Sequence, residues 1–65
     1  MVRYPQVEVQ LVGEDGNAFA ILGRVKKAML RAGLTNDQVQ EYYDEATSGN
    51  YDNLLRVTQR YVGVN

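Results

Sequence analysis

The sequence predicts a small α+β domain in which one N-terminal strand is followed by three short helices. Three observations support this fold class: an alternating apolar pattern near the N-terminus, a longer stretch with helical spacing, and two shorter amphipathic stretches separated by turn residues. With 65 residues, the chain corresponds to a single small domain, residues 1–65, near the lower size at which one core is stable without disulfides or metals.

Residues 6–12 predict the strand, because Val7, Val9 and Leu11 alternate with polar neighbours and would share one face. A lone strand cannot satisfy its own backbone hydrogen bonds. Its partner is therefore either the C-terminal segment 61–64 or the same strand of another subunit.

Residues 17–32 predict the first helix, since apolar side chains recur at about 3.6 residues per turn and form one broad face. That face comprises Ala18, Ile21, Leu22, Val25, Ala28, Met29 and Ala32. Gly23 costs about 1 kcal/mol relative to Ala in a helix interior, so we expect a close backbone approach there, such as that of another helix. Phe19 and Leu30 flank the core face and widen the apolar surface, and Gly33 ends the helix.

Two further helices are predicted after Gly33. Thr35 to Gln38 has the form of a capping box, which predicts a helix reaching about Thr47 with an acidic outer side. Asn50 can cap a third helix from Tyr51 to about Tyr61.

Composition excludes several kinds of chemistry. The chain has no Cys and no His, which rules out disulfides, thiolate chemistry, zinc fingers and imidazole catalysis. Its Asp residues lack the spacing of a calcium loop, so we expect neither a metal nor another cofactor. Asp44 and Asp52 are the carboxylate pair considered for acid–base chemistry, but so small a fold has little volume to shield them, and we expect no enzyme activity.

The charge and hydropathy pattern also limits partners and location. A formal net charge of −1 argues against binding to duplex nucleic acid or to anionic membranes. No apolar run approaches the roughly 18–20 residues of a membrane span, and residues 1–5 lack the apolar core of a signal peptide. We therefore expect a cytoplasmic protein.

The turn from Gly13 to Phe19 connects the predicted strand to the first helix. The first N–H groups of a helix lack intrahelical partners, and the helix dipole favours negative charge there. Asp15, Gly16 and Asn17 are therefore candidate ligand-binding residues, and the Phe19 ring is a candidate to stack on a ligand. If the turn needs a positive φ, we expect it at Gly16. A helix cap formed by Asn17 or Asp15 alone explains the same residues and is favoured on local grounds.

A basic row and a group of tyrosines supply the other candidates. Arg24, Lys27 and Arg31 follow an i, i+3, i+7 spacing opposite the core face, which is typical either of a solvated surface or of contacts to phosphate. Arg24 is the best single phosphate candidate, and Lys27 the next.

Five tyrosines could contribute stacking surfaces, although most are expected in the core or in an interface. Tyr51 is the first candidate to stack on a nucleobase, because it begins a helix beside Asn50, whose amide could read a base edge.

Two segments carry a resemblance to a known group. Residues 9–23, VQLVGEDGNAFAILG, and residues 46–55, ATSGNYDNLL, resemble very short phage, prophage and bacterial proteins. The group is similar to the phage sponge proteins that sequester cyclic oligonucleotide signals of CBASS immunity. Asn50 stands where that pattern has Asp, and residues 61–64 replace an expected Trp and acidic residue. The Asn50 change matters for ligand preference because an amide donates as well as accepts.

The resemblance implies a non-catalytic, anti-CBASS protein for immune evasion. It would act in the host cytoplasm as a homo-oligomer, a dimer or tetramer, and would bind a cyclic dinucleotide or a related nucleotide. Two alternatives stay open. The chain could be a small protein-interaction module that binds a host or phage protein through a helical, Tyr-rich surface. A helical DNA-binding protein is the third reading, and the charge of −1 together with the acidic second helix argues against it.

Overall fold

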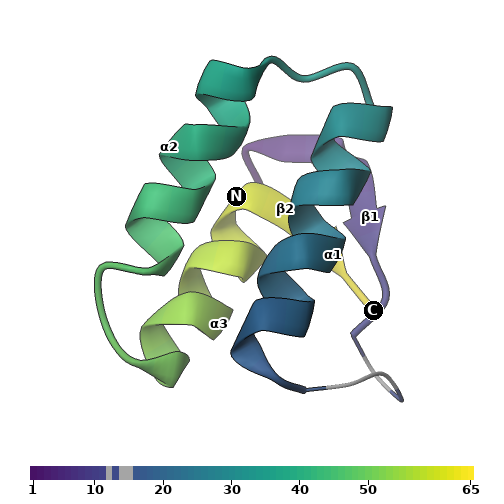
Figure 1. Cartoon of the computed structure of the whole chain (residues 1–65). Helices are drawn as coiled ribbons and strands as arrows, with labels where there is room; N and C mark the ends of the chain where they lie inside the picture. Colours follow the sequence, from purple (N-terminus) through teal and green to yellow (C-terminus); the bar gives the residue numbers. More distant parts are fainter. Residues whose placement is uncertain (12, 14–15) are drawn as a thin grey trace.

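The computed structural model describes residues 1–11, 13 and 16–65. Its elements follow the order β1 (Tyr4–Val9), α1 (Ala18–Arg31), α2 (Asn36–Ala46), α3 (Tyr51–Tyr61) and β2 (Val62–Val64). Figure 1 shows the three helices in front of the two short strands. The α+β class and the order of one strand and three helices are confirmed.

The strands β1 and β2 form a two-stranded parallel sheet, with Tyr4 opposite Val62 and Val9 opposite Val64. Of the two partners considered for the N-terminal strand, the sheet uses the C-terminal segment of the same chain. Parallel strands need a long crossover, and the three helices supply it. The strand lies earlier than the predicted residues 6–12, although Leu11 N–H still donates to the carbonyl of Asn65 at 2.9 Å.

Side-chain caps set the start of each helix. Asn17 Oδ1 accepts the Phe19 N–H at 2.8 Å at the start of α1. Thr35 forms the predicted capping box with Gln38: its Oγ1 accepts the Gln38 N–H at 3.2 Å, and Gln38 Oε1 accepts the Thr35 N–H at 2.7 Å. Asn50 Oδ1 accepts the Asn53 N–H at 3.0 Å at the start of α3.

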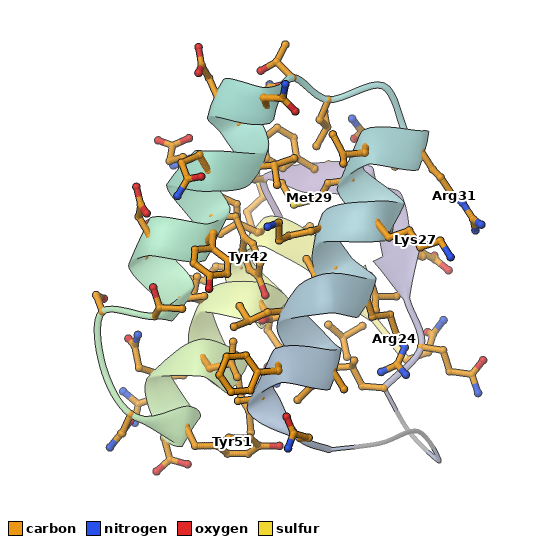
Figure 2. All side chains as sticks on the ribbon, viewed as in Figure 1. Arg24, Lys27, Met29, Arg31, Tyr42 and Tyr51 are labelled. Atoms are coloured by element: carbon orange, nitrogen blue, oxygen red, sulfur yellow. The ribbon has the colours of Figure 1, made fainter. Side chains whose placement is uncertain are left out.

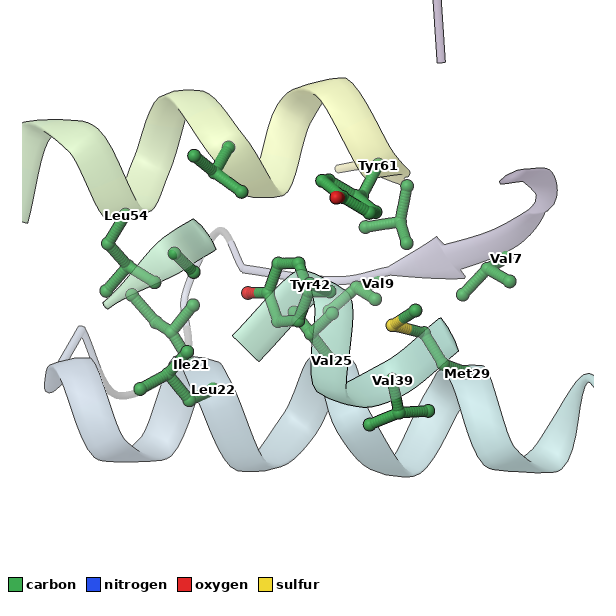
Figure 3. Close-up of a cluster of buried hydrophobic side chains, with 13 residues drawn as sticks. Val7, Val9, Ile21, Leu22, Val25, Met29, Val39, Tyr42, Leu54 and Tyr61 are labelled. Atoms are coloured by element: carbon green, nitrogen blue, oxygen red, sulfur yellow. The ribbon is translucent and has the colours of Figure 1, made fainter. Parts of the chain in front are cut away.

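The core lies between the helices and the sheet, and Tyr42 is at the centre of the cluster in Figure 3. Tyr42 is fully buried, and its hydroxyl lies 2.7 Å from Thr58 Oγ1. The buried residues include the predicted Val7, Val9, Ile21, Leu22, Val25 and Met29. Ala32 was expected in the core but is exposed, because α1 ends at Arg31 and Ala32 is its C-cap.

Two expectations about glycines are not met within this chain. Apart from the backbone of its own helix and its chain neighbours, a Cβ built on Gly23 would meet no described atom within 4 Å, so the close approach expected there stays a prediction. The positive φ expected at Gly16 occurs at Gly13 instead, where φ is 81°. At the end of α1, Gly33 has a φ of 90°, as expected for a helix-terminating glycine.

Within the described part of the chain, no helix has both the length and the apolar character needed to cross a membrane.

Candidate functional site

A pocket lies where α1 begins, α2 ends and α3 begins. Its volume is about 250 Å³, somewhat below the roughly 300–1,000 Å³ of typical small-molecule sites. Among the described residues its lining is mainly apolar. The lining residues are Ala18, Phe19, Leu22, Ala46, Thr47, Gly49, Asn50, Tyr51 and Leu54.

The tight connection from α2 to α3 shapes one wall of the pocket. A Cβ on Gly49 would lie 2.9 Å from the Cβ of Asn53, which is closer than real Cβ atoms approach. Asn53 Nδ2 donates to the Glu45 carbonyl at 3.0 Å and joins the first turn of α3 to the last turn of α2, while Thr47 Oγ1 donates to the Tyr43 carbonyl at 2.7 Å at the end of α2 itself. The close approach of Asn53 requires glycine at position 49.

The hydroxyl of Tyr51 connects two distant segments at this pocket. It donates to the carbonyl oxygen of Gly16 at 2.5 Å, so the start of α3 is joined to the turn before α1. Tyr51 is 45% exposed, and Phe19 is 79% exposed. Two aromatic rings at the pocket are therefore accessible to a planar ligand.

Both asparagines predicted as ligand residues lie at this junction, and both act as helix caps. Asn17 caps α1, and Asn50 lines the pocket and caps α3. The cap favoured on local grounds for Asn17 is thus present. The N-terminal ends of two helices meet beside the pocket, and each end is electropositive. The first turn of α1 contains no acidic residue, whereas that of α3 contains Asp52.

The basic residues lie elsewhere. Figure 2 shows Arg24, Lys27 and Arg31 along a side of α1 that is turned away from Tyr51. Lys27 is exposed and Arg24 is partly buried, and neither lines the pocket. The structure brings together Gly16, Asn17, Phe19, Asn50 and Tyr51, but it leaves Arg24 and Lys27 outside this group. The ligand-binding roles of Arg24 and Lys27 stay predictions, and Asp15 lies outside the described residues.

Tyr51 also differs from the other tyrosines. Tyr42 and Tyr61 are buried, and Tyr4 and Tyr43 pack partly buried against the core. Four of the five tyrosines thus lie in the core or against it, as the expectation of core or interface positions requires. Burial raises the pKa of the Tyr42 phenol, and it raises the pKa of Tyr61 to about 12 with help from a hydrogen bond to Glu45. Neither buried phenol is available to stack on a ligand.

No protein-family model, curated protein or solved structure matches the chain.

The residues that line the pocket come from two segments of the sequence. All its described lining residues fall within residues 9–23 and 46–55, the two segments singled out in the sequence. Leu22, Ala46, Thr47, Gly49 and Leu54 were not predicted as site residues, because as single residues they are ordinary core or turn positions. The signal that could have indicated these five residues is that each of the two segments contains a predicted helix start.

The pocket chemistry suits binding by shape and by neutral polar groups. None of the described lining residues carries a carboxylate, an ammonium or a guanidinium group. Across the described residues, no three acidic, His or Cys side chains are grouped so as to hold a metal ion. A ligand here would meet apolar side chains, two aromatic rings and helix N-termini.

Proposed function

We propose that this protein is a non-catalytic binding protein that sequesters a cyclic oligonucleotide immune signal. It would act as a phage anti-CBASS sponge and as a homo-oligomer. The observation that carries the proposal is the pocket whose described lining residues all belong to the segments 9–23 and 46–55, with Phe19 and Tyr51 exposed at its edge. The resemblance in these same two segments supports the same function.

The size and lining of the pocket favour one nucleobase. A cavity of about 250 Å³ is small for a whole cyclic dinucleotide but suits a single planar base on an apolar floor. Stacking of a base on an aromatic side chain contributes about 1–3 kcal/mol. The phosphates of such a ligand would stay near the start of α1, whose dipole favours anions and whose first turn has no acidic residue.

The protein-interaction alternative has less support. It relies on a Tyr-rich helical surface, but Tyr42 and Tyr61 are buried and Tyr4 and Tyr43 are partly buried. Of the five tyrosines, Tyr51 alone is exposed, and it lies at the pocket. The exposed tyrosine surface that this alternative needs is therefore reduced to one tyrosine ring.

To test the proposal, a larger apolar side chain is introduced into the pocket while its polar groups are left unchanged. Ala18 is partly buried and lines the pocket, so Ala18→Leu should occupy the space that the base needs. Ala32→Leu is the matched control, since Ala32 is exposed and lies outside the pocket. Calorimetric titration of cyclic di-AMP, cyclic di-GMP and linear dinucleotides into each protein gives the affinities.

We expect the wild type and Ala32→Leu to bind a cyclic nucleotide with similar affinity, and Ala18→Leu to bind at least tenfold more weakly, a difference of about 1.4 kcal/mol. The variants should remain folded by circular dichroism. The proposal is wrong if the folded wild type binds none of these nucleotides, or if Ala18→Leu binds as well as the wild type.

A further inference from the structure

The strand β2 pairs with β1 along one edge, and its other edge has no strand partner among the described residues. Peptide groups in a strand point alternately to its two sides. Asn65 directs both of its groups toward β1, because its N–H donates to the Val9 carbonyl at 3.0 Å and its carbonyl accepts the Leu11 N–H at 2.9 Å. The N–H and carbonyl groups of Val64 therefore point away from β1, where another chain can pair with them.

The residues of β2 do not protect this open edge. Edge strands usually carry a proline or a charged side chain that hinders pairing with other chains. β1 contains Pro5 and Glu8, whereas β2 is Val-Gly-Val. A third strand can therefore be added to β2, as in proteins that bind a peptide by extending a sheet. Because β2 has only three residues, such a peptide needs further contacts beside the strand.

Two adjoining grooves beside β2 offer these contacts. The first groove has a volume of about 450 Å³, and its described lining consists of Val2, Gln59 and residues 62–65. No described residue of β1 lines it, so it follows the side of β2 that β1 leaves open. The second groove, of about 560 Å³, lies on the outside of α3 and also includes Gln59. An extended chain that pairs with β2 would therefore continue past Gln59 along α3.

The second groove is basic. Its described lining residues are Asn53, Arg56, Gln59 and Arg60, with two guanidinium groups and no carboxylate. Arg60 pairs with Glu45 at 2.8 Å. Arg56 is exposed, and no described residue forms an ion pair or a hydrogen bond with its side chain. Because Arg binds a carboxylate through two parallel hydrogen bonds, this groove favours an acidic chain.

We infer that an extended acidic segment of another protein binds across these two grooves as a third strand beside β2. Its backbone forms hydrogen bonds with the N–H and carbonyl groups of Val64, an apolar side chain lies against Val2, and a carboxylate pairs with Arg56. The open peptide groups of Val64 favour a polypeptide over a nucleic acid, which has no strand backbone to pair with them. The inference does not depend on the proposed function, because the two grooves share no described lining residue with the pocket at Phe19 and Tyr51.

The strand pairing is tested with Val64→Pro. Proline removes the N–H that the peptide needs, and a strand tolerates proline where its N–H points away from the sheet. Val64→Thr keeps the N–H and is the matched control. The probe is a fluorescently labelled hexapeptide, Val-Glu-Val-Glu-Val-Glu, whose binding is followed by fluorescence anisotropy. We expect Val64→Thr to bind it within about threefold of the wild type, and a folded Val64→Pro to bind it at least about tenfold more weakly.

Amide hydrogen exchange of the wild type tests the same contact without a substitution. Exchange at the Val64 N–H should slow at least about tenfold when the hexapeptide is saturating, because the bound strand accepts this hydrogen. Unchanged exchange at Val64 with the peptide bound places the peptide elsewhere and overturns the inference. A folded Val64→Pro variant that binds as tightly as Val64→Thr overturns it as well.

The acidic character of the partner is tested with Arg56→Gln and with a second hexapeptide, Val-Lys-Val-Lys-Val-Lys. Arg31→Gln removes the same charge from an exposed position of α1 and is the matched control. We expect the lysine peptide to bind the wild type at least about tenfold more weakly than the glutamate peptide. Arg56→Gln should weaken binding of the glutamate peptide at least about threefold, and Arg31→Gln should leave it within about twofold. The inference is wrong if the folded wild type does not bind the glutamate peptide, if it binds both peptides equally, or if the two Arg substitutions have equal effects.

Discussion

The side-chain oxygen of Asn17 is used within the chain, where it accepts the Phe19 N–H at 2.8 Å. Removing such a cap typically costs about 1 kcal/mol, so Asn17→Ala should lower the free energy of unfolding by about that amount. Urea denaturation of the variant gives this value, and Asn17→Asp, which keeps a capping oxygen, should lose much less. Unchanged stability together with lost nucleotide binding would instead assign Asn17 to the ligand.

In the buried hydrogen bond between Tyr42 and Thr58, one hydroxyl group is the donor and the other is the acceptor. Thr58 Oγ1 donates to the Leu54 carbonyl at 2.8 Å, so its single hydrogen is used and Tyr42 must donate to Thr58. Tyr42→Phe then removes a hydrogen bond and leaves no buried donor unpaired, at a cost of about 1 kcal/mol. Thr58→Val leaves the buried Tyr42 hydroxyl without this acceptor and should cost more, about 1–3 kcal/mol. Equal losses in urea denaturation would contradict this assignment of the donor.

At the scale of helices, glycines at two positions should respond in opposite ways. Gly49→Ala forces a Cβ to 2.9 Å from the Cβ of Asn53, so α2 and α3 must separate, and we expect a loss of about 1–3 kcal/mol. Gly23→Ala adds a methyl group in open space and should stabilise the isolated chain by up to about 1 kcal/mol. Thermal melts at low protein concentration, where pairing of copies contributes least, measure both changes. Similar effects of the two substitutions would show that the connection at Gly49 is not tight.

The helices could be predicted from the sequence because their starts are local. The capping box of Thr35 and Gln38 and the cap at Asn50 depend on residues within three positions, and both are present. The partner of β1 could not be decided, since the pairing with β2 joins opposite ends of the sequence. The pocket is likewise built from three helix ends that only the tertiary fold brings together, so Tyr51 and Asn50 were predicted but Ala46, Thr47 and Gly49 were not.

At the scale of the molecule, a polar cluster joins the N-terminus to α2 and α3. Arg3 pairs with Glu41 at 3.1 Å and lies 4.7 Å from the centre of the Tyr61 ring. Tyr61 donates to Glu45 at 2.9 Å, and Arg60 pairs with Glu45 at 2.8 Å. The ion pairs are largely exposed and add little to stability. The cluster matters because it surrounds the hydroxyl group of Tyr61, whose pKa is raised in the folded protein.

Tyr61 makes the free energy of unfolding depend on pH in the alkaline range. The pKa of Tyr61 is about 12 in the fold, against about 10 in an unfolded chain. A pKa that is higher in the folded state gives a contribution that is complete below the unfolded value and is lost as the pH rises through the folded value. The free energy of unfolding should therefore be level up to about pH 10 and fall toward pH 12. Tyr61→Phe should show a smaller fall in urea titrations across this range, and an equal fall in both proteins would contradict the explanation.

The parallel pairing of β1 with β2 also has a kinetic consequence. The two strands can meet only after the chain between them has folded back on itself, and closing so long a loop is entropically slow unless the helices form first. The sheet should therefore assemble after the transition state, so Val64→Ala should speed unfolding while leaving the folding rate nearly unchanged. Stopped-flow chevron plots would show the change in the unfolding arm alone. A chain that folds in this order has its N-terminal strand unpaired until the last step, and association of that edge with other chains would compete with folding during that interval.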